Sequence, residues 1–501
     1  MDEILRSLAL FRAESVLTAV LLLVVLVDAG GAPWRNAVTR GLTVAGLAAA
    51  LLLLVRLSAS GVSEEIFSGM LVVDPLANFF KVLLVLAALL LVLSFTFRNS
   101  RELRGLGQGE FYVLLLALTL SNMLMATAAD LVMLYLALEM VSITSYVMVA
   151  YLKGDRLSNE ASLKYVLFGA VSTGAMLYGL SLLYGLTGQT SLAGIQEALT
   201  GGLGDPRPVY VIAILIIAGF GFKTASVPFH FWCPDVYQGA ATPVTALLSV
   251  APKAAAFALL LRFFFQGFAQ PGGTAWELAA TIDWPMLLLV ISVVTMTVGN
   301  VAALTQTDMK RLLAYSSIAH AGYVMMGAVA LSENGARGVM VYLLAYLVMN
   351  LGAFLVVMLV HLHEGSFDLR DYPGLYRRAP FLTAVMAICL LSLMGIPPLV
   401  GFMGKLYVFA AVIEQGSPAR PTLWWFAVVG AVNAAIAAYY YARVLKTMII
   451  DAGGEDKPPL VLATADRLWL AGFAAANVVP LLFWGSIEGW AKASLVFYAG
   501  R

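Results

Sequence analysis

Charged side chains inside long apolar runs are the residues of this sequence best placed to do chemistry. Glu139 lies about nine residues into its run, roughly 13 Å deep if the run is helical. Lys223, Lys253 and Lys405 lie within or beside three further apolar runs. A charge at such a depth costs a few kcal/mol or more, so it is rare and marks an ion pathway or a proton relay. We therefore expect these four groups to pass protons through the interior of a membrane bundle.

Lys164 and His320 are two further candidates for the same pathway. Lys164 opens an apolar run in the segment NEASLKYVLFG, and His320 lies within LAYSSIAHAGYVMMG. Structural alternatives stay open, because Lys164 can extend its amine to the membrane surface and His320 can be a hydrogen-bonded core histidine. A static salt bridge between Glu139 and Lys223 that fixes helix packing is likewise an alternative to proton transfer.

Proline residues interrupt two of the apolar runs beside the lysines. Pro228 follows Lys223, and since proline lacks a backbone donor we expect that helix to end early or to be discontinuous. The segment GIPP at 395–398 precedes Lys405. Non-helical backbone at membrane depth is tolerated only where protein or a wet cavity covers it, so each break should border a hydrated path. We expect His230 and Asp235 to organise the first break rather than to conduct protons.

Composition places the chain among membrane proteins. Hydrophobic residues make up 61% of its 501 positions and charged residues 12%, whereas soluble domains carry about 25% charged residues. The net charge of +1 gives no reason to expect a nucleic-acid partner. Cys233 and Cys389 form no CxxC pair, and the sequence has neither a phosphate loop nor a histidine pair spaced for haem. We expect no metal, cofactor or redox centre on this chain.

The predicted fold is all-α and polytopic, with about fourteen membrane-spanning helices. The helices are expected at 9–28, 38–58, 71–97, 111–129, 131–152, 161–186, 208–228, 242–266, 284–304, 311–331, 337–362, 380–414 (broken), 422–449 and 467–486. The loops that follow the odd-numbered helices carry the excess of lysine and arginine. This bias puts both termini on the outer, periplasmic face.

A faint internal repeat divides the sequence. Asn122 precedes Asp130 by eight residues, and Asn300 precedes Asp308 by the same spacing. Each copy later reaches a proline-broken helix, helix 7 in the first and helix 12 in the second. Because each unit has five helices, helices 4–8 and 9–13 enter the membrane from opposite faces, as in transporters built from inverted repeats. The predicted division is 1–110 for helices 1–3, 111–266 for the first repeat, 284–449 for the second and 450–501 for helix 14.

The segment GFGFKTASVPFHFWCPDVYQGAATPVTALLSVAPKAAAF closely resembles the signature of the antiporter-like membrane subunits of respiratory complex I. The PDVYQGAATPVTALL form and the lysine in SVAPKAAAF resemble the N-type members, and the Mrp cation antiporters share a related segment. The resemblance assigns proton translocation to the helix-5 glutamate, the lysines of helices 6, 7, 8 and 12 and, less firmly, the helix-10 histidine. These positions are occupied here by Glu139, Lys164, Lys223, Lys253, Lys405 and His320.

The resemblance implies a membrane subunit of a proton-translocating NADH:quinone oxidoreductase in a bacterial inner membrane. FMN, iron–sulfur clusters and quinone are then expected on partner subunits, and quinone acts on this chain only indirectly. The implied partners are antiporter-like M-type subunits, small K- and J-type subunits, and lipid. The main alternative is an Mrp-type cation/proton antiporter without a redox link. A scaffold with vestigial charges is a further alternative, and the electron donor is open between NADH and ferredoxin- or deazaflavin-linked enzymes.

Overall fold

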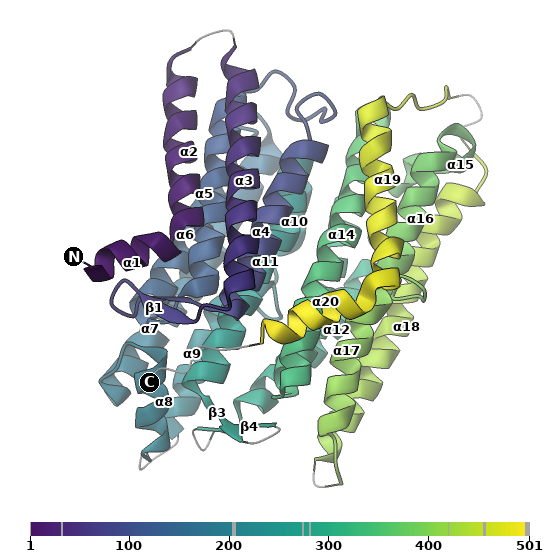
Figure 1. Ribbon diagram of the computed structural model, residues 1–501. Coiled ribbons are helices and arrows are strands. Elements are labelled where there is room, and N and C mark those ends of the chain that lie inside the picture. The colour runs from purple at the N-terminus through teal and green to yellow at the C-terminus, as the bar shows by residue number, and fades with distance from the viewer. Residues whose placement is uncertain are drawn as a thin grey trace.

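Apolar helices make up most of this computed structural model, which describes residues 2–31, 34–202, 207–272, 275–279, 282–418, 420–453 and 457–495 (Figure 1). Within those residues, twelve helices are long and apolar enough to cross a membrane. They are α3 (Arg35–Ser60), α4 (Pro75–Ser94), α5 (Gln108–Thr127), α6 (Leu131–Val149), α7 (Arg156–Thr187), α9 (Arg207–Thr224), α11 (Thr242–Gly267), α12 (Trp284–Ala303), α13 (Met309–Val329), α14 (Glu333–Glu364), α18 (Pro421–Ile449) and the C-terminal unit Thr464–Ala493. The chain is therefore a polytopic all-α membrane protein.

Two interrupted pairs explain the difference between twelve helices and the predicted fourteen. The first pair is α1 (Asp2–Leu10) and α2 (Arg12–Ala29), which bend by 75° and together give a thirteenth candidate span. The second pair is α16 (Pro380–Met394) and α17 (Val400–Gln415), each too short to span alone. Taken together, α16 and α17 form the broken helix that the sequence predicts for helix 12.

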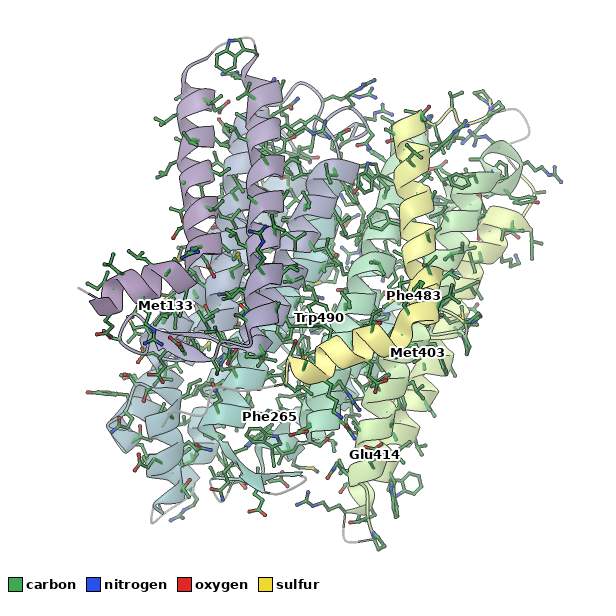
Figure 2. All side chains as sticks on the ribbon, viewed as in Figure 1. Met133, Phe265, Met403, Glu414, Phe483 and Trp490 are labelled. Carbon is green, nitrogen blue, oxygen red and sulfur yellow. The ribbon has the colours of Figure 1, made fainter. Side chains whose placement is uncertain are left out.

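Short elements fill the connections. They are the helices α8 (Leu192–Thr200), α10 (Trp232–Gly239) and α15 (Leu375–Arg378), the 3-10 turn Leu369–Asp371, and two hairpins, β1 (Glu64–Ile66) with β2 (Leu71–Val73) and β3 (Ala269–Gly272) with β4 (Ala275–Leu278). The C-terminal unit consists of α19 (Thr464–Val478), the 3-10 turn Val479–Phe483 and α20 (Trp484–Ala493). Figure 1 shows α20 turning sideways from α19 toward the N-terminal helices. There Trp490, labelled in Figure 2, packs against Phe79 of α4 with ring centroids 4.4 Å apart.

The two repeats share a backbone device at equivalent places. Asp130 caps the start of α6 by accepting from Val132 N–H at 2.8 Å, and Asp308 caps α13 by accepting from Arg311 N–H at 2.9 Å. Each aspartate also forms an isolated β-bridge with a residue four positions past the end of the next long helix, Ser191 after α7 in the first repeat and Asp368 after α14 in the second. The carboxylates satisfy N–H groups of the first helical turn that would otherwise lack an intrahelical partner.

These equivalent caps lie on opposite faces of the bundle. Glu102 belongs to the loop that precedes α5, and it contacts Lys310 in the first turn of α13. Asp308 therefore lies at the face where α5 begins, whereas Asp130 follows the end of α5 at the other face. The arrangement is that of an inverted repeat.

The most buried helices occupy the centre of the bundle. Within the most apolar window of each helix, 100% of α11, 94% of α13 and 89% of α14 is buried inside the chain, against 33% for α18. Polar groups on α11, α13 and α14 are thus shielded from lipid by other helices. The outer helices present leucine, valine and phenylalanine instead, as expected for a lipid-facing wall.

Candidate functional site

The break after α9 creates the surroundings of Lys223. Ala225 adopts a left-handed conformation with φ of 59°, the Val227–Pro228 peptide bond is cis, and the chain resumes as α10. Ser226 N–H donates to Gly221 O at 2.7 Å, and Trp232 Nε1 donates to Phe222 O at 3.1 Å, so one backbone N–H and one side chain beyond α9 satisfy its last carbonyls. The discontinuous helix predicted from Pro228 is confirmed.

Lys223 lies in an aromatic cage. Its side chain is 2% exposed, and its Nζ lies 5.9 Å from the centre of the Tyr165 ring and 5.4 Å from that of Phe222. Neither Lys223 Nζ nor Glu139 Oε1 has a hydrogen-bond partner within the described residues. Glu139 is only half-buried on α6. The structure therefore does not hold these two groups in a closed, hydrogen-bonded salt bridge.

Lys253 lies on α11, the most buried helix, directly after Pro252. It is 3% exposed, and its Nζ donates to Ser317 Oγ on α13. The same Nζ lies 5.8 Å from the centre of the Tyr237 ring, and the Tyr237 hydroxyl is 3.4 Å from Ser317 Oγ. The Lys253 ammonium thus donates to Ser317 on α13 and lies beside the Tyr237 ring of α10.

Lys405 is held by the end of a broken helix. Its Nζ donates to Leu393 O at 3.2 Å and Met394 O at 2.8 Å, the last carbonyls of α16. A helix C-terminus carries about half a negative charge, so it stabilises the ammonium without a carboxylate. Gly395 makes this approach possible, because its φ of +85° suits glycine and an added Cβ would lie 2.8 Å from Lys405 Cδ. Lys405 Nζ also lies 4.9 Å from the centre of the Tyr323 ring.

One face of α13 connects the two lysines. Ser317, His320 and Tyr323 lie three residues apart on successive turns, a stripe that covers about 9 Å along the axis. Ser317 contacts Lys253 at one end of this stripe, and Tyr323 contacts Lys405 at the other.

His320 occupies the middle of that stripe. It is 3% exposed, with Nδ1 2.9 Å from Tyr342 OH and Nε2 3.2 Å from Tyr441 OH. The structure thus brings Lys253, His320 and Lys405 together through α13.

Aromatic rings, not hydrogen bonds, lie between Lys223 and Lys253. Tyr165 stacks on Trp232 with ring centroids 4.4 Å apart, and Trp232 meets Tyr237 at 6.5 Å. Lys223 borders this set of rings at Tyr165, and Lys253 borders it at Tyr237. A proton passing between the two lysines would have to cross this aromatic layer.

Lys164 lies outside this buried row. Its side chain is 38% exposed, and its Nζ contacts Asp235 Oδ2 at 2.6 Å and Glu160 Oε1 at 2.7 Å. Asp235 also accepts from Arg311 Nη1 at 2.6 Å. The predicted role of Asp235 as an organiser fits this geometry, since it ties α10 to α7 and to α13. Nothing in the structure joins Lys164 to Lys223 or Lys253 through described hydrogen bonds.

Several residues of the site were not singled out from the sequence. The hydroxyl partners Tyr237, Ser317, Tyr342 and Tyr441 carry no charge, so nothing in their local sequence separates them from packing residues. Buried ion pairs were missed as well. Lys81 meets Glu14 at 2.6 Å, and Arg262 meets Asp74 at 2.8 Å, with every side chain at most 1% exposed. The rule that singled out Lys223, a charge inside an apolar run, would have found Lys81 and Arg262 too.

Across the part of the chain that the structure describes, no group of three or more His, Cys, Asp or Glu side chains is placed to hold a metal ion. The polar groups between Lys253 and Lys405 along α13 are hydroxyls and the His320 imidazole, which can donate and accept protons.

Comparisons with known proteins agree with this geometry. The family model described as "NADH:quinone oxidoreductase/Mrp antiporter, TM" matches residues 128–436. NADH-quinone oxidoreductase subunit N of Anaeromyxobacter sp. is 45% identical over 515 residues, covering 100% of this chain and 98% of the relative. NAD(P)H-quinone oxidoreductase subunit 2 of Synechococcus sp. is 46% identical over 440 residues, covering 87% of this chain and 79% of the relative.

Solved structures show the same fold. A chain of respiratory complex I from Thermus thermophilus with bound aureothin has a TM-score of 0.78 and 32% identity, covering 96% of this chain and 99% of that one. A chain of the Mrp complex from Dietzia sp. has a TM-score of 0.82 over 99% of this chain and 98% of that one; its 18% identity supports a shared fold alone. The chain therefore belongs to the NADH:quinone oxidoreductase/Mrp antiporter family of membrane proteins, and within it to the relatives of subunit N.

Proposed function

We propose that this chain is a proton-translocating membrane subunit of an NADH–quinone oxidoreductase in a bacterial inner membrane. The observation that carries the proposal is the buried polar face of α13, where Lys253 donates to Ser317 at one end, His320 lies between Tyr342 and Tyr441, and Lys405 lies over the Tyr323 ring at the other end. Buried amines without carboxylate partners are costly, so they are rare and mark ion pathways or proton relays. The full-length similarity to subunit N of other bacteria supports the coupling to NADH and quinone.

In the proposed mechanism, the open Glu139–Lys223 pair is the control element. A unit charge pair at 4 Å is worth about 4 kcal/mol at an effective dielectric constant near 20. That energy corresponds to roughly three pKa units, enough to switch a buried amine between its charged and neutral forms. Closing the pair would hold the proton on Lys223, and opening it would release the proton toward Lys253. From there, the hydroxyl and imidazole groups on α13 offer a route to Lys405.

Electron transfer belongs to other subunits in this proposal. FMN, iron–sulfur clusters and quinone would be bound by partner chains, including membrane subunits of the M, K and J types. Quinone chemistry would reach this chain only through charges on a neighbouring subunit. Both termini would lie on the periplasmic side, as the lysine and arginine bias of the loops predicts.

The test is NADH-driven proton translocation in membrane vesicles with Lys253→Ala. We expect NADH oxidation to persist while the number of protons moved per NADH falls. Lys446→Ala, which removes an exposed lysine paired with Asp451, is the matched control and should pump as the wild type does. A wild-type proton yield in assembled Lys253→Ala complex would refute the proposal.

The same vesicles examine the Mrp-type alternative. An antiporter without a redox link would exchange sodium or potassium for protons with no NADH present. Cation-dependent exchange of that kind, in a preparation lacking flavin and iron–sulfur subunits, would favour the antiporter. Co-purification with those subunits would exclude it, and their identity would also settle the electron donor.

A further inference from the structure

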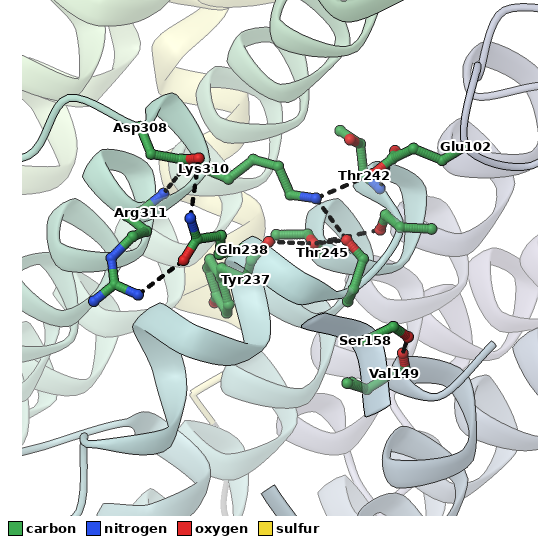
Figure 3. A network of polar contacts seen from close by, with 12 residues as sticks. Glu102, Val149, Ser158, Tyr237, Gln238, Thr242, Thr245, Asp308, Lys310 and Arg311 are labelled. Atoms are coloured by element: carbon green, nitrogen blue, oxygen red, sulfur yellow. Dashed lines mark hydrogen bonds and ion pairs between the residues drawn. The ribbon is translucent and has the colours of Figure 1, made fainter. Parts of the chain in front are cut away.

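A buried ion pair joins three segments at the junction between α10 and α11 (Figure 3). Lys310, in the first turn of α13, places its Nζ 3.2 Å from Glu102 Oε1, in the loop that precedes α5. The two side chains are 1% and 11% exposed. The same Nζ donates to Ala240 O at 2.6 Å, directly after α10, and lies 4.5 Å from the centre of the Phe367 ring.

Glu102 also replaces a missing helix cap. Ala241, the N-cap residue of α11, has no side chain able to cap the helix. The first N–H of α11, that of Thr242, donates instead to Glu102 Oε2 at 2.7 Å. A carboxylate at a helix N-terminus is stabilised by the helix dipole as well as by the hydrogen bond. Burial raises and the nearby Lys310 ammonium lowers the pKa of the Glu102 carboxyl, and its pKa is lowered overall, so it stays ionised at neutral pH.

A pocket of about 420 Å³ borders the junction, and its lining includes Glu102, Gln238, Gly239 and His361. The junction residues Ala240, Ala241 and Thr242 are themselves fully buried. The ion pair binds the backbone on both sides of the junction. Lys310 donates to Ala240 O, and Glu102 accepts from Thr242 N–H.

Clamping this junction also places Tyr237. The Tyr237 carbonyl accepts from Thr245 Oγ1 at 3.1 Å across the junction, and its hydroxyl lies 3.4 Å from Ser317. Its ring centre lies 5.8 Å from Lys253 Nζ. Lys310 and Ser317 both belong to α13. That helix therefore contacts α10 at two places, through Lys310 at Ala240 O and through Ser317 at the Tyr237 hydroxyl. A shift of α10 would move the Tyr237 ring beside Lys253 and the Tyr237 hydroxyl beside Ser317, the residue that accepts from Lys253.

We propose that Glu102 and Lys310 are positioning residues for the proton step at Lys253, since they fix the α10–α11 junction and thereby the placement of Tyr237. The inference rests on the proposed function, because it assigns these residues to the same proton path. Neither residue touches Lys253 within the described contacts, and the proposal assigns their effect to the placement of α10. A loss of the pair would then loosen α10 while leaving electron transfer on partner subunits intact.

The native cysteines provide a direct readout of α10. Cys233 lies on α10, one turn before Tyr237, and is fully buried; Cys389, the other cysteine of the chain, is buried on α16. Alkylation of each thiol by a small reagent can be quantified from peptides of this chain in the assembled complex. In Lys310→Met, we expect Cys233 to be labelled faster than in the wild type and Cys389 to be labelled at the wild-type rate. Lys446→Met is the matched lysine control and should change neither rate.

Proton yield is measured in the same membranes. We expect Lys310→Met to keep NADH oxidation and to lose part of the protons moved per NADH. If Lys310→Met does not assemble, the same two measurements are made on Glu102→Gln. Its amide oxygen can still accept from Thr242 N–H, whereas the ion pair with Lys310 is lost. A wild-type proton yield, or a reduced yield with Cys233 as unreactive as in the wild type, would overturn the proposal. Failure of both variants to assemble would assign the pair to folding and overturn it too.

Lys253→Ala separates this inference from the proposed function. A normal proton yield in Lys253→Ala would refute the proposed proton path itself, whatever the yield of Lys310→Met. A reduced yield in Lys253→Ala with a normal yield in Lys310→Met would remove only the positioning role of the pair.

Discussion

The buried ammonium groups of Lys253 and Lys405 are stabilised by different kinds of contact. Lys253 uses a hydroxyl, Ser317, and an aromatic face, Tyr237. Lys405 uses the carbonyl end of a half-helix, Leu393 and Met394. Neither lysine is locked to a carboxylate, and an ammonium without a fixed countercharge can give up its proton at lower cost than one in a buried salt bridge. This common feature suits groups that must change charge during turnover.

Gly395→Ala tests the carbonyl site of Lys405. The left-handed φ of +85° costs an alanine about 1–2 kcal/mol, and the new Cβ would lie 2.8 Å from Lys405 Cδ, so the amine should be displaced from the α16 carbonyls. We expect fewer protons per NADH in membrane vesicles. Gly188→Ala is the matched control, because Gly188 also has a positive φ, +67°, but has open space around it. Equal proton yields in the two variants would show that displacement of Lys405 has no consequence.

At the residue scale, the buried charged residues could be predicted from the sequence, but their hydrogen-bonding partners could not. Glu139, Lys223, Lys253, Lys405 and His320 each stand out because an ionisable group interrupts an apolar run. The hydroxyl partners of Lys253 and His320 lie 22 to 121 positions away and have no such contrast with their neighbours. Lys164 met the same criterion as the others, yet its side chain is 38% exposed and pairs with Asp235 and Glu160.

Helix breaks and buried ion pairs hold the elements in place. The first break is stabilised by Trp232, and the second leaves carbonyls free for Lys405. Arg262 on α11 meets Asp74, the N-cap of α4, in a fully buried, two-oxygen contact at 2.8 Å to each oxygen. This pair fixes the N-terminal helices to the most buried helix of the repeats.

Arg262→Met should destabilise the chain at this contact. Removing one partner of a buried pair leaves an uncompensated charge and costs about 3–5 kcal/mol. Breaking the exposed Lys446–Asp451 pair with Lys446→Met should cost about 0–1 kcal/mol. Thermal unfolding of the purified complex, followed by loss of this subunit, measures both. A midpoint for Arg262→Met equal to that of Lys446→Met would contradict a structural role for the buried pair.

Apolar run lengths predicted the helices well, because a membrane span needs about 20 apolar residues and leaves a strong signal. Proline positions predicted the breaks at 228 and 395–398 for the same kind of direct reason, a missing backbone donor. The hairpins β1–β2 and β3–β4, the 75° bend between α1 and α2, and the sideways course of α20 were not predicted. These features depend on packing against distant segments, as Trp490 against Phe79 illustrates.

The inverted repeat determines the layout of the whole molecule. Two five-helix units enter from opposite faces, and each places a broken helix at a lysine, Lys223 in one and Lys405 in the other. The central helices α11, α13 and α14 are shielded from lipid and carry the groups between them. The path we propose thus runs across both repeats: from Lys223, past the aromatic layer, to Lys253 and along α13 to Lys405.

A serial path makes a specific prediction for combined substitutions. If each proton passes both Lys253 and Lys405, then removing either blocks the same step, and effects of residues acting as one unit are not additive. Independent routes would instead lose separate shares of the protons. Lys446→Ala again serves as the exposed-lysine control.

The most direct measurement is the number of protons moved per NADH oxidised in vesicles carrying Lys253→Ala, Lys405→Ala or both. A single route through α13 predicts that each single variant lowers the yield and that the double variant equals the lower of the two. A double variant that loses the sum of two separate deficits, or single variants that pump like the wild type, would contradict it.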